Sequence, residues 1–179
     1  MPVAIRPYRP ADLDACRDLW EVLTERHRII YEDPTIGGPD VRLYFDTHLA
    51  RVGPEHVWVA EEDGMVIGMT GLIAAEGEEE AEVEPVVVAQ GHRSRGVGEQ
   101  LVQAAVAEAK RLGVRFLNIG PVARNSEAIA MFVRQGFGLI GHVQLFMEFR
   151  GPTDDAPARG PERSPAEVAA LLEQLKHWS

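Results

Sequence analysis

The sequence predicts an α/β (α+β) domain, in which strands and amphipathic helices alternate and helices flank a sheet. Three stretches carry this prediction. The β-branched run 86–88 leads through a basic, glycine-containing turn into a helix over 97–112. A β-hairpin is predicted over 56–74, around the turn signal Asp63-Gly64. A long amphipathic helix is predicted to begin at Asp12.

The N-terminal quarter reads as a strand followed by two helices. Residues 3–6 form a short first strand, which the prolines at positions 7 and 10 close. The helix from Asp12 to about Tyr31 carries an apolar stripe, and a loop rich in glycine and proline follows over 32–40. A second helix is expected over 41–50.

The middle of the chain supplies most of the sheet. The hairpin strands are expected over 56–61 and 65–74, and an acidic, solvated turn over 76–80 leads into a strand over 81–88. In the helix that follows, apolar residues repeat at Leu101, Ala105, Ala109 and Leu112. A strand over 114–120 comes next, then a short helix capped by Asn125 and ended by Gly136, and a last strand over 139–149.

The composition changes near residue 151, so we divide the chain into a domain (1–150), a linker (151–164) and a C-terminal amphipathic helix (165–179). Ser164-Pro165-Ala166-Glu167 is a capping box with proline at the first helical position. The apolar stripe of this helix has to be buried, either on its own domain or on a partner subunit, and the sequence does not choose between them.

Composition excludes several classes of function. A chain of 179 residues fits one domain, and its net charge of −10 argues against nucleic acid as a partner. That charge suits an amine-bearing acceptor, although solubility alone would explain it. Because no apolar run approaches ~18 residues, we expect no membrane partner. The single cysteine, Cys16, cannot form an internal disulfide, which predicts a cytoplasmic protein.

The turn over 93–99 is a predicted anion site, because a helix start offers unpaired N–H groups and the positive end of the helix dipole. Gly96 and Gly98 have no Cβ to keep phosphate oxygens away from the backbone. A Walker loop would need Gly-Lys-Ser/Thr here, and a dinucleotide fingerprint would need glycine at position 101, where Leu101 stands. The alternative is an ordinary strand-to-helix turn with two solvated arginines.

Two segments resemble the GNAT superfamily of N-acetyltransferases. Arg93-x-x-Gly96-x-Gly98 is similar to its pyrophosphate loop, Gln/Arg-x-x-Gly-x-Gly/Ala. The segment from Asn125 to Phe137 is similar to Asn-x-x-Ala-…-Tyr-…-Gly-Phe, and the likeness extends over about residues 3–149. It implies a mixed, mostly antiparallel, splayed sheet flanked by helices.

The resemblance also implies acetyl-CoA as co-substrate, with no metal. Its pyrophosphate would lie on the backbone between Arg93 and Glu99, with positive charge from Arg93 and Arg95. The backbone N–H of Val88 would bind the thioester carbonyl and stabilise the oxyanion. The expected cofactor contacts are therefore Val86, Val87, Val88, Arg93, Ser94, Arg95, Gly96, Val97, Gly98, Glu99, Asn125 and Phe132.

The resemblance implies Glu84 as the base that deprotonates the amine, with Glu82 as the alternative on the same strand face. The family's usual acid is a tyrosine in the second segment, where this chain has Phe132. Phenylalanine has no proton to give, so water or another group must serve; Tyr31, Tyr44 and His142 are weak substitutes.

By the same resemblance, the first helix–loop–helix region lines the acceptor pocket. We expect substrate contacts from His27, Tyr31 and Tyr44, although packing on the core is the commoner role for such side chains. The acceptor would be a primary amine of a small molecule or peptide. The alternative hypothesis is a catalytically weak acyl-CoA-binding sensor or interaction module. The short segment after Phe137 favours a homodimer in which a second subunit completes the sheet.

Overall fold

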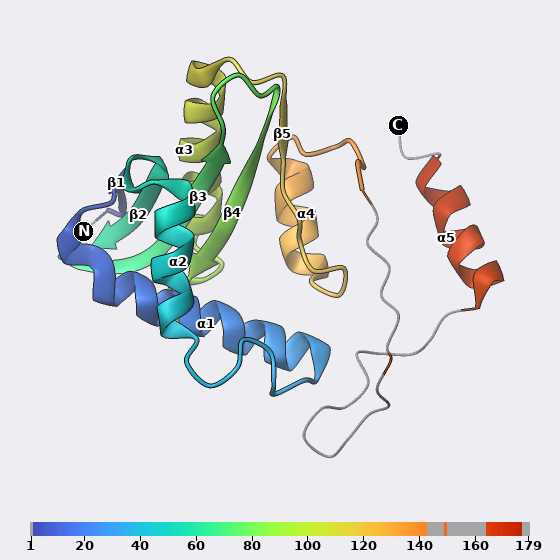
Figure 1. The fold of residues 1–179 in the computed structure, drawn as a ribbon, viewed down its shortest axis with the longest axis horizontal. Helices are drawn as coiled ribbons and strands as arrows, with labels where there is room; N and C mark the ends of the chain where they lie inside the picture. The colour runs from blue at the N-terminus through green and yellow to red at the C-terminus, as the bar shows by residue number, and fades with distance from the viewer. Residues whose placement is uncertain (1, 143–148, 150–163, 177–179) are drawn as a thin grey trace.

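The protein is described by a computed structural model that covers residues 2–142, 149 and 164–176. Figure 1 shows one five-stranded sheet with helices packed on it. Its elements in chain order are β1 (Ala4–Pro7), α1 (Leu13–Tyr31), α2 (Arg42–Val52), β2 (Val57–Glu62), β3 (Met65–Ala74), β4 (Glu80–Val88), α3 (Val97–Leu112), β5 (Phe116–Asn118), α4 (Ser126–Arg134) and α5 (Pro165–Lys176). These bounds lie within a few residues of those expected as far as α4.

The strands lie in chain order. Strands β1 to β4 are antiparallel neighbours, and β5 runs parallel to β4. A hairpin joins β2 to β3, because Asp63 (φ 52°) and Gly64 (φ 79°) both adopt the left-handed conformation at its turn. The sheet is therefore mixed and mostly antiparallel, as the resemblance implies.

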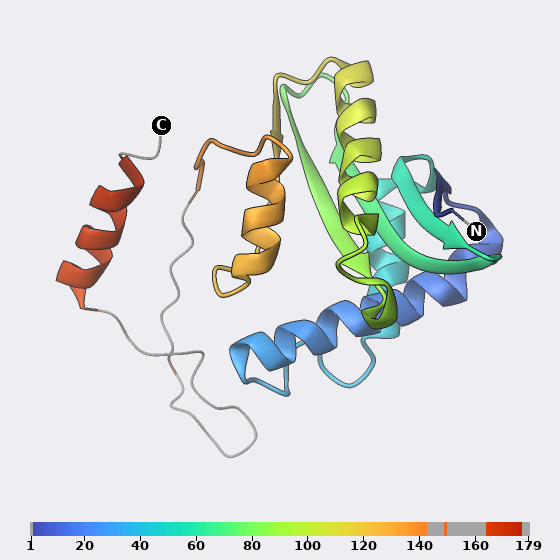
Figure 2. The same ribbon diagram turned by 180° about the vertical axis from the view of Figure 1, so that it is seen from behind.

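Helices cover both faces of the sheet (Figures 1 and 2). Helices α1 and α2 bury Cys16, Leu19 and Phe45 against Val59 and Met69. Helix α3 lies on the opposite face, where its buried residues Leu101, Ala105 and Ala109 meet the other side of the strands. The last apolar position of that stripe, Leu112, stays 39% exposed at the helix end.

Strand β4 contains a β-bulge, which reverses the face of the sheet to which the following side chains point. Thr70 pairs with Val86 and Leu72 pairs with Val83, so two residues of β4 oppose one residue of β3. Residues 83 and 87 of a regular strand would face the same side. Here Val83 packs under α3, whereas Val87 packs with the α1 core. The bulge lies at Glu84 and Pro85, whose peptide bond is cis.

Strands β4 and β5 part after a short pairing. Only Glu80–Glu82 of β4 pair with β5, through Phe116–Asn118, and the chain then runs away from β4 towards α4 (Figure 1). Among the described residues, no strand therefore pairs with this edge of β4 in its C-terminal half. This is the splayed geometry that the resemblance implies.

A buried ion cluster fixes the start of α1. Both Asp12 oxygens accept from the Arg6 guanidinium, at 2.7 and 2.8 Å, and Asp12 also accepts from the Arg9 backbone N–H at 2.8 Å. Asp12 is 6% exposed, and the hydrogen bonds from Arg6 hold its pKa below the usual value. Arg6 is also paired with Glu61 on β2, so this cluster joins β1, α1 and β2.

The structure tests only some of the predictions made for the C-terminal region. Residues 139–142, the first part of the expected last strand, are not in a strand; 143–148 of that strand, and linker residues 151–163, lie outside the described residues. Helix α5 begins with the expected capping box, in which Ser164 Oγ accepts from the Glu167 N–H and the Glu167 carboxylate accepts from the Ser164 N–H. Of the helices in the described ranges, none combines the length and apolar character needed to cross a bilayer.

Candidate functional site

A cleft of about 250 Å³ lies where β4 has separated from β5. The C-terminal half of β4, the following loop and the start of α3 form one wall, while α4 and α1 form the others. All the expected cofactor residues except Arg95 and Phe132 line this cleft: Val86, Val87, Val88, Arg93, Ser94, Gly96, Val97, Gly98, Glu99 and Asn125. Segments that are about forty residues apart in sequence therefore meet here.

The loop before α3 is shaped to present backbone N–H groups. Ser94 (φ 58°) and Gly96 (φ 76°) are left-handed, and Gly96 is the N-cap residue of α3. No side chain caps this helix start, so its first N–H groups remain available to a ligand. A Cβ built on Gly98 would lie 3.8 Å from Met131 and from Val88, both lining residues, so it would occupy part of the cleft. The arrangement fits an extended anion that approaches the backbone closely.

The open edge of β4 exposes backbone groups of Val88. The Ala89 N–H donates to the Ile67 carbonyl at 2.8 Å, and Val88 pairs with Gly68. Hydrogen-bonded and non-hydrogen-bonded pairs alternate along antiparallel strands, so the N–H and C=O of Val88 face away from β3. On that side the Val88 carbonyl accepts from Arg93 Nε at 3.1 Å. The Val88 N–H is thus directed to the edge that β5 has left, where the cleft lies.

Arg95, expected at the pyrophosphate, binds another partner. Its guanidinium donates to both Glu62 oxygens, at 2.6 and 3.0 Å, and His92 Nδ1 lies 3.0 Å from the same carboxylate. The hydrogen bonds from Arg95 lower the pKa of Glu62. This cluster ties the loop to the end of β2, so Arg95 holds the loop in place. Positive charge in the cleft comes instead from Arg26, Arg93 and Arg134.

Helix α4 closes the cleft from the far side. Asn125 caps it as expected, since its side-chain oxygen accepts from the Ala128 N–H at 3.2 Å. Phe132 is 7% exposed and packs edge-on against Phe137, with ring centroids 6.1 Å apart. Phe132 lies outside the cleft lining, where α4 contributes Ala128 and Met131 instead. Its side chain serves the packing of α4 in this structure.

A second pocket, of about 270 Å³, is lined by other residues of α1 and β4. It lies between α1, α2 and the bulge of β4, and its polar and aromatic lining residues include Trp20, Thr24, Tyr44, Thr47, His48, Arg51 and Glu84. The bulge explains why Glu84 belongs to this pocket, whereas Val86 to Val88 line the cleft. Of the three expected substrate residues, Tyr44 lines the second pocket and His27 lines the cleft. Tyr31 lines neither of them.

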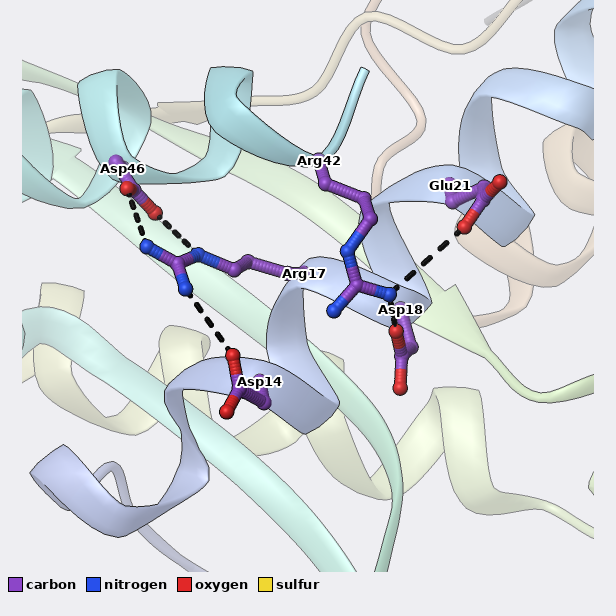
Figure 3. A network of polar contacts seen from close by, with 6 residues as sticks. All are labelled: Asp14, Arg17, Asp18, Glu21, Arg42 and Asp46. Carbon is purple, nitrogen blue, oxygen red and sulfur yellow. Dashed lines mark hydrogen bonds and ion pairs between the residues drawn. The ribbon is translucent and has the colours of Figure 1, made fainter. Parts of the chain in front are cut away.

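An ion-pair network keeps α1 and α2 at a fixed spacing (Figure 3). Arg17 of α1 donates to both oxygens of Asp46 of α2, at 2.6 and 2.9 Å, and its remaining nitrogen lies 3.0 Å from Asp14. Arg42 of α2 pairs with Asp18 and Glu21 of α1. None of these six residues lines the second pocket, so the network joins its two helical walls outside the lining.

The candidates for a base at or near the second pocket are Glu84, His48 and Glu82. Glu84 accepts from Arg51 at 3.1 Å, and the two side chains are 41% and 57% exposed. His48 is 6% exposed; burial lowers its pKa, which keeps the ring neutral near pH 7, and its Nε2 atom has no hydrogen-bond partner among the described residues. Burial also raises the pKa of Glu82, which lines neither pocket. Glu84 is therefore better placed as a base than Glu82.

Sequence reasoning missed Trp20 and Arg51 as pocket residues. A signal existed for Arg51, because Tyr44, His48 and Arg51 are spaced i, i+4 and i+7, which places them on one face of α2. Within the described ranges, no group of three or more His, Cys, Asp or Glu side chains is arranged to hold a metal ion.

Comparison with known proteins identifies the fold family. The profile described as the acetyltransferase (GNAT) family matches residues 16–137, which is most of the chain. The chain belongs to the acetyltransferase (GNAT) family. The matched range includes both segments singled out above, the loop before α3 and the helix that begins after Asn125.

Solved acetyltransferase structures share this fold. A ribosomal-protein-alanine N-acetyltransferase from Brucella melitensis is 26% identical, with a TM-score of 0.59, and the match covers 74% of this chain and 83% of that one. An N-acetyltransferase from Staphylococcus aureus Mu50 is 24% identical, with a TM-score of 0.61 and coverage of 79% and 86%. AAC(6')-Iy, in complex with the bisubstrate analog CoA-S-monomethyl-acetylneamine, is 20% identical, with a TM-score of 0.60 and coverage of 83% and 99%. Among curated proteins, none matches this chain.

Proposed function

We propose that this GNAT protein is an N-acetyltransferase that moves the acetyl group of acetyl-CoA to a primary amine of a small molecule or peptide. One observation carries the proposal: β4 contributes to two pockets, one with an exposed helix start and an open strand edge, the other with a carboxylate. Glu84, in the bulge, lines the second pocket, and Val86 to Val88, after the bulge, line the cleft. Helix α1 lines both pockets.

In this proposal the cleft binds acetyl-CoA, which supplies an acetyl group activated as a thioester. The first N–H groups of α3 and the Arg93 guanidinium would bind the pyrophosphate. The absence of a Cβ at Gly98 allows the phosphate oxygens to reach the backbone. The Val88 N–H would donate to the thioester carbonyl and stabilise the negative charge that forms there during attack.

The second pocket would hold the amine beside Glu84. An amine must be neutral to attack, so Glu84 would accept its proton, directly or through one water molecule. The neutral amine nitrogen then bonds to the acetyl carbon, the C–S bond breaks and CoA leaves as the thiolate, while the nitrogen loses its extra proton to water as the amide forms. A thiol is acidic enough that the thiolate needs little assistance near neutral pH, so water can reprotonate it. Phe132 has no proton to offer and lies outside the cleft lining.

Phe132 also supports a second candidate, an acyl-CoA-binding module with weak turnover. The two candidates differ in one observable: a module binds acetyl-CoA in the cleft without releasing CoA when amines are added. An enzyme releases CoA in proportion to the amine consumed.

The test is CoA release from acetyl-CoA across a panel of amines by the wild type, Glu84→Gln and Glu80→Gln. Glu80 is the matched control, because it is an exposed glutamate at the start of the same strand. We expect Glu84→Gln to lower turnover at least tenfold and to flatten its pH dependence, with CoA affinity unchanged. Normal turnover in Glu84→Gln would remove Glu84 as the base. Acetyl-CoA binding with no release on any amine would favour the module.

A further inference from the structure

The second pocket presents charges of opposite sign side by side. Arg51 donates to Glu84 at 3.1 Å, and both side chains are about half exposed, so solvent and ligands can reach the pair. Such exposed pairs contribute little to stability and can exchange partners at low cost. The other titratable side chains of the lining are Tyr44 and His48, and burial lowers the pKa of His48.

Arg51 has binding capacity to spare. A guanidinium carries five N–H donors in a planar fork, and only the bond to Glu84 is present among the described residues. Arg42 and Arg17, on the two helices that line the pocket, are already paired with aspartates outside it. Arg51 is thus the cationic group that this pocket offers to a ligand. A carboxylate is the ligand group that matches the guanidinium fork with two parallel bonds.

We propose that Arg51 forms a carboxylate subsite, and that the acceptor is an amino carboxylate whose amine lies beside Glu84. This inference rests on the proposed function and names its substrate class. An ammonium and a carboxylate on one molecule replace both partners of the Arg51–Glu84 pair, so every charge stays compensated. A polyamine would instead bring its second positive charge against Arg51, which disfavours it.

The rest of the pocket suits an apolar body on the acceptor. Trp20, Ile36 and Tyr44 supply hydrophobic surface, and Tyr44 is 52% exposed. Trp20 is held in place by ring contacts to Phe45 and His48, with centroids 6.1 and 4.9 Å away. A rigid aromatic wall of this kind favours an aliphatic or aromatic side chain. The preferred acceptors are therefore apolar free amino acids.

The test compares acid and amide pairs: leucine with leucinamide, phenylalanine with phenylalaninamide, and spermidine as the polycation. We expect the wild type to prefer each acid at least tenfold in kcat/KM. Arg51→Gln should abolish that preference by raising KM for the acids. Arg42→Gln is the matched control, an arginine of the same helix that pairs outside the pocket, and it should retain the preference.

Calorimetric titration of the CoA-loaded protein with the same pairs separates the two hypotheses. Acetylation of amides or spermidine as efficiently as of the acids would overturn the carboxylate subsite and leave the N-acetyltransferase proposal standing. If no amine is acetylated but the acids still bind with an Arg51-dependent preference, the subsite stands and the proposed reaction fails. Equal affinity for acids and amides would overturn the subsite whatever the turnover.

Discussion

Replacing Gly98 by alanine should raise or preserve stability while weakening CoA binding. Gly98 is the second residue of α3, and its φ lies in the ordinary range. The added methyl group would lie 3.8 Å from Met131 and Val88, which is ordinary van der Waals contact, so the fold accommodates it. Alanine is favoured over glycine in helices by up to about 1 kcal/mol, which corresponds to roughly 2–4 °C in Tm for a chain of this size.

The same methyl group would stand in the cleft, between lining residues that face the expected pyrophosphate. If the methyl group prevents one hydrogen bond between a phosphate oxygen and a backbone N–H, the binding free energy of CoA weakens by about 1.5–3 kcal/mol. That corresponds to a Kd for CoA that is weaker by roughly 10- to 150-fold. Calorimetric titration with CoA and thermal unfolding of the same samples measure the two effects.

Two further glycines provide the controls. Gly96 (φ 76°) and Gly77 (φ 83°) are both left-handed with no atom within 4 Å of an added Cβ, so alanine should cost each about 1–2 kcal/mol of stability. Gly96 lies in the loop and Gly77 in the acidic turn before β4. Gly77→Ala should therefore keep CoA affinity. Wild-type CoA affinity in Gly98→Ala, with the fold intact, would refute the close approach of phosphate to this backbone.

Two more predictions concern residues that support the site and the fold. Glu62→Gln should raise KM for acetyl-CoA roughly two- to fivefold with kcat unchanged, because the loop loses the carboxylate that holds Arg95. Initial rates at saturating amine measure this KM, and a change in kcat alone would contradict the prediction. Asp12→Ala should cost roughly 3 kcal/mol at pH 7, since it leaves Arg6 without its buried partner. Arg6 lowers the pKa of Asp12 in the folded state. The stabilisation is therefore complete above the unfolded-state pKa, near 3.8, and disappears as the pH falls through the folded-state pKa. Urea unfolding across that range should show an acid-dependent loss in the wild type that is smaller in the variant.

Much of the fold follows from short windows of sequence. The hairpin at Asp63-Gly64, the helix from Val97 and the capped start at Asn125 are each encoded by residues within one turn or one helix of each other. The same locality explains why the glycine-containing turn before α3 could be predicted. Its conformation depends on Gly96 and on the helix start beside it, and the distant Glu62 then holds it through Arg95.

Other features required the tertiary structure. Arg95 looks like a second phosphate ligand in sequence, and only the position of Glu62, 33 residues away, directs it elsewhere. Periodicity places 83 and 87 on one face of β4, whereas the bulge against β3 puts them on opposite faces. Arg51 and Glu84 are likewise 33 residues apart, so their pairing could not be read from either segment.

The amino-acid sequence by itself determined the order of the elements, the strand–loop–helix that would bind the cofactor, and the family to which the chain belongs. The tertiary structure decided which side chains converge on each pocket, which arginine faces a ligand and which only holds the loop. The physical reason is the distance along the chain over which each interaction acts. Backbone conformation responds to neighbours a few residues away, but the partner of a charged side chain is whichever opposite charge the packing of helices on the sheet brings within hydrogen-bonding distance.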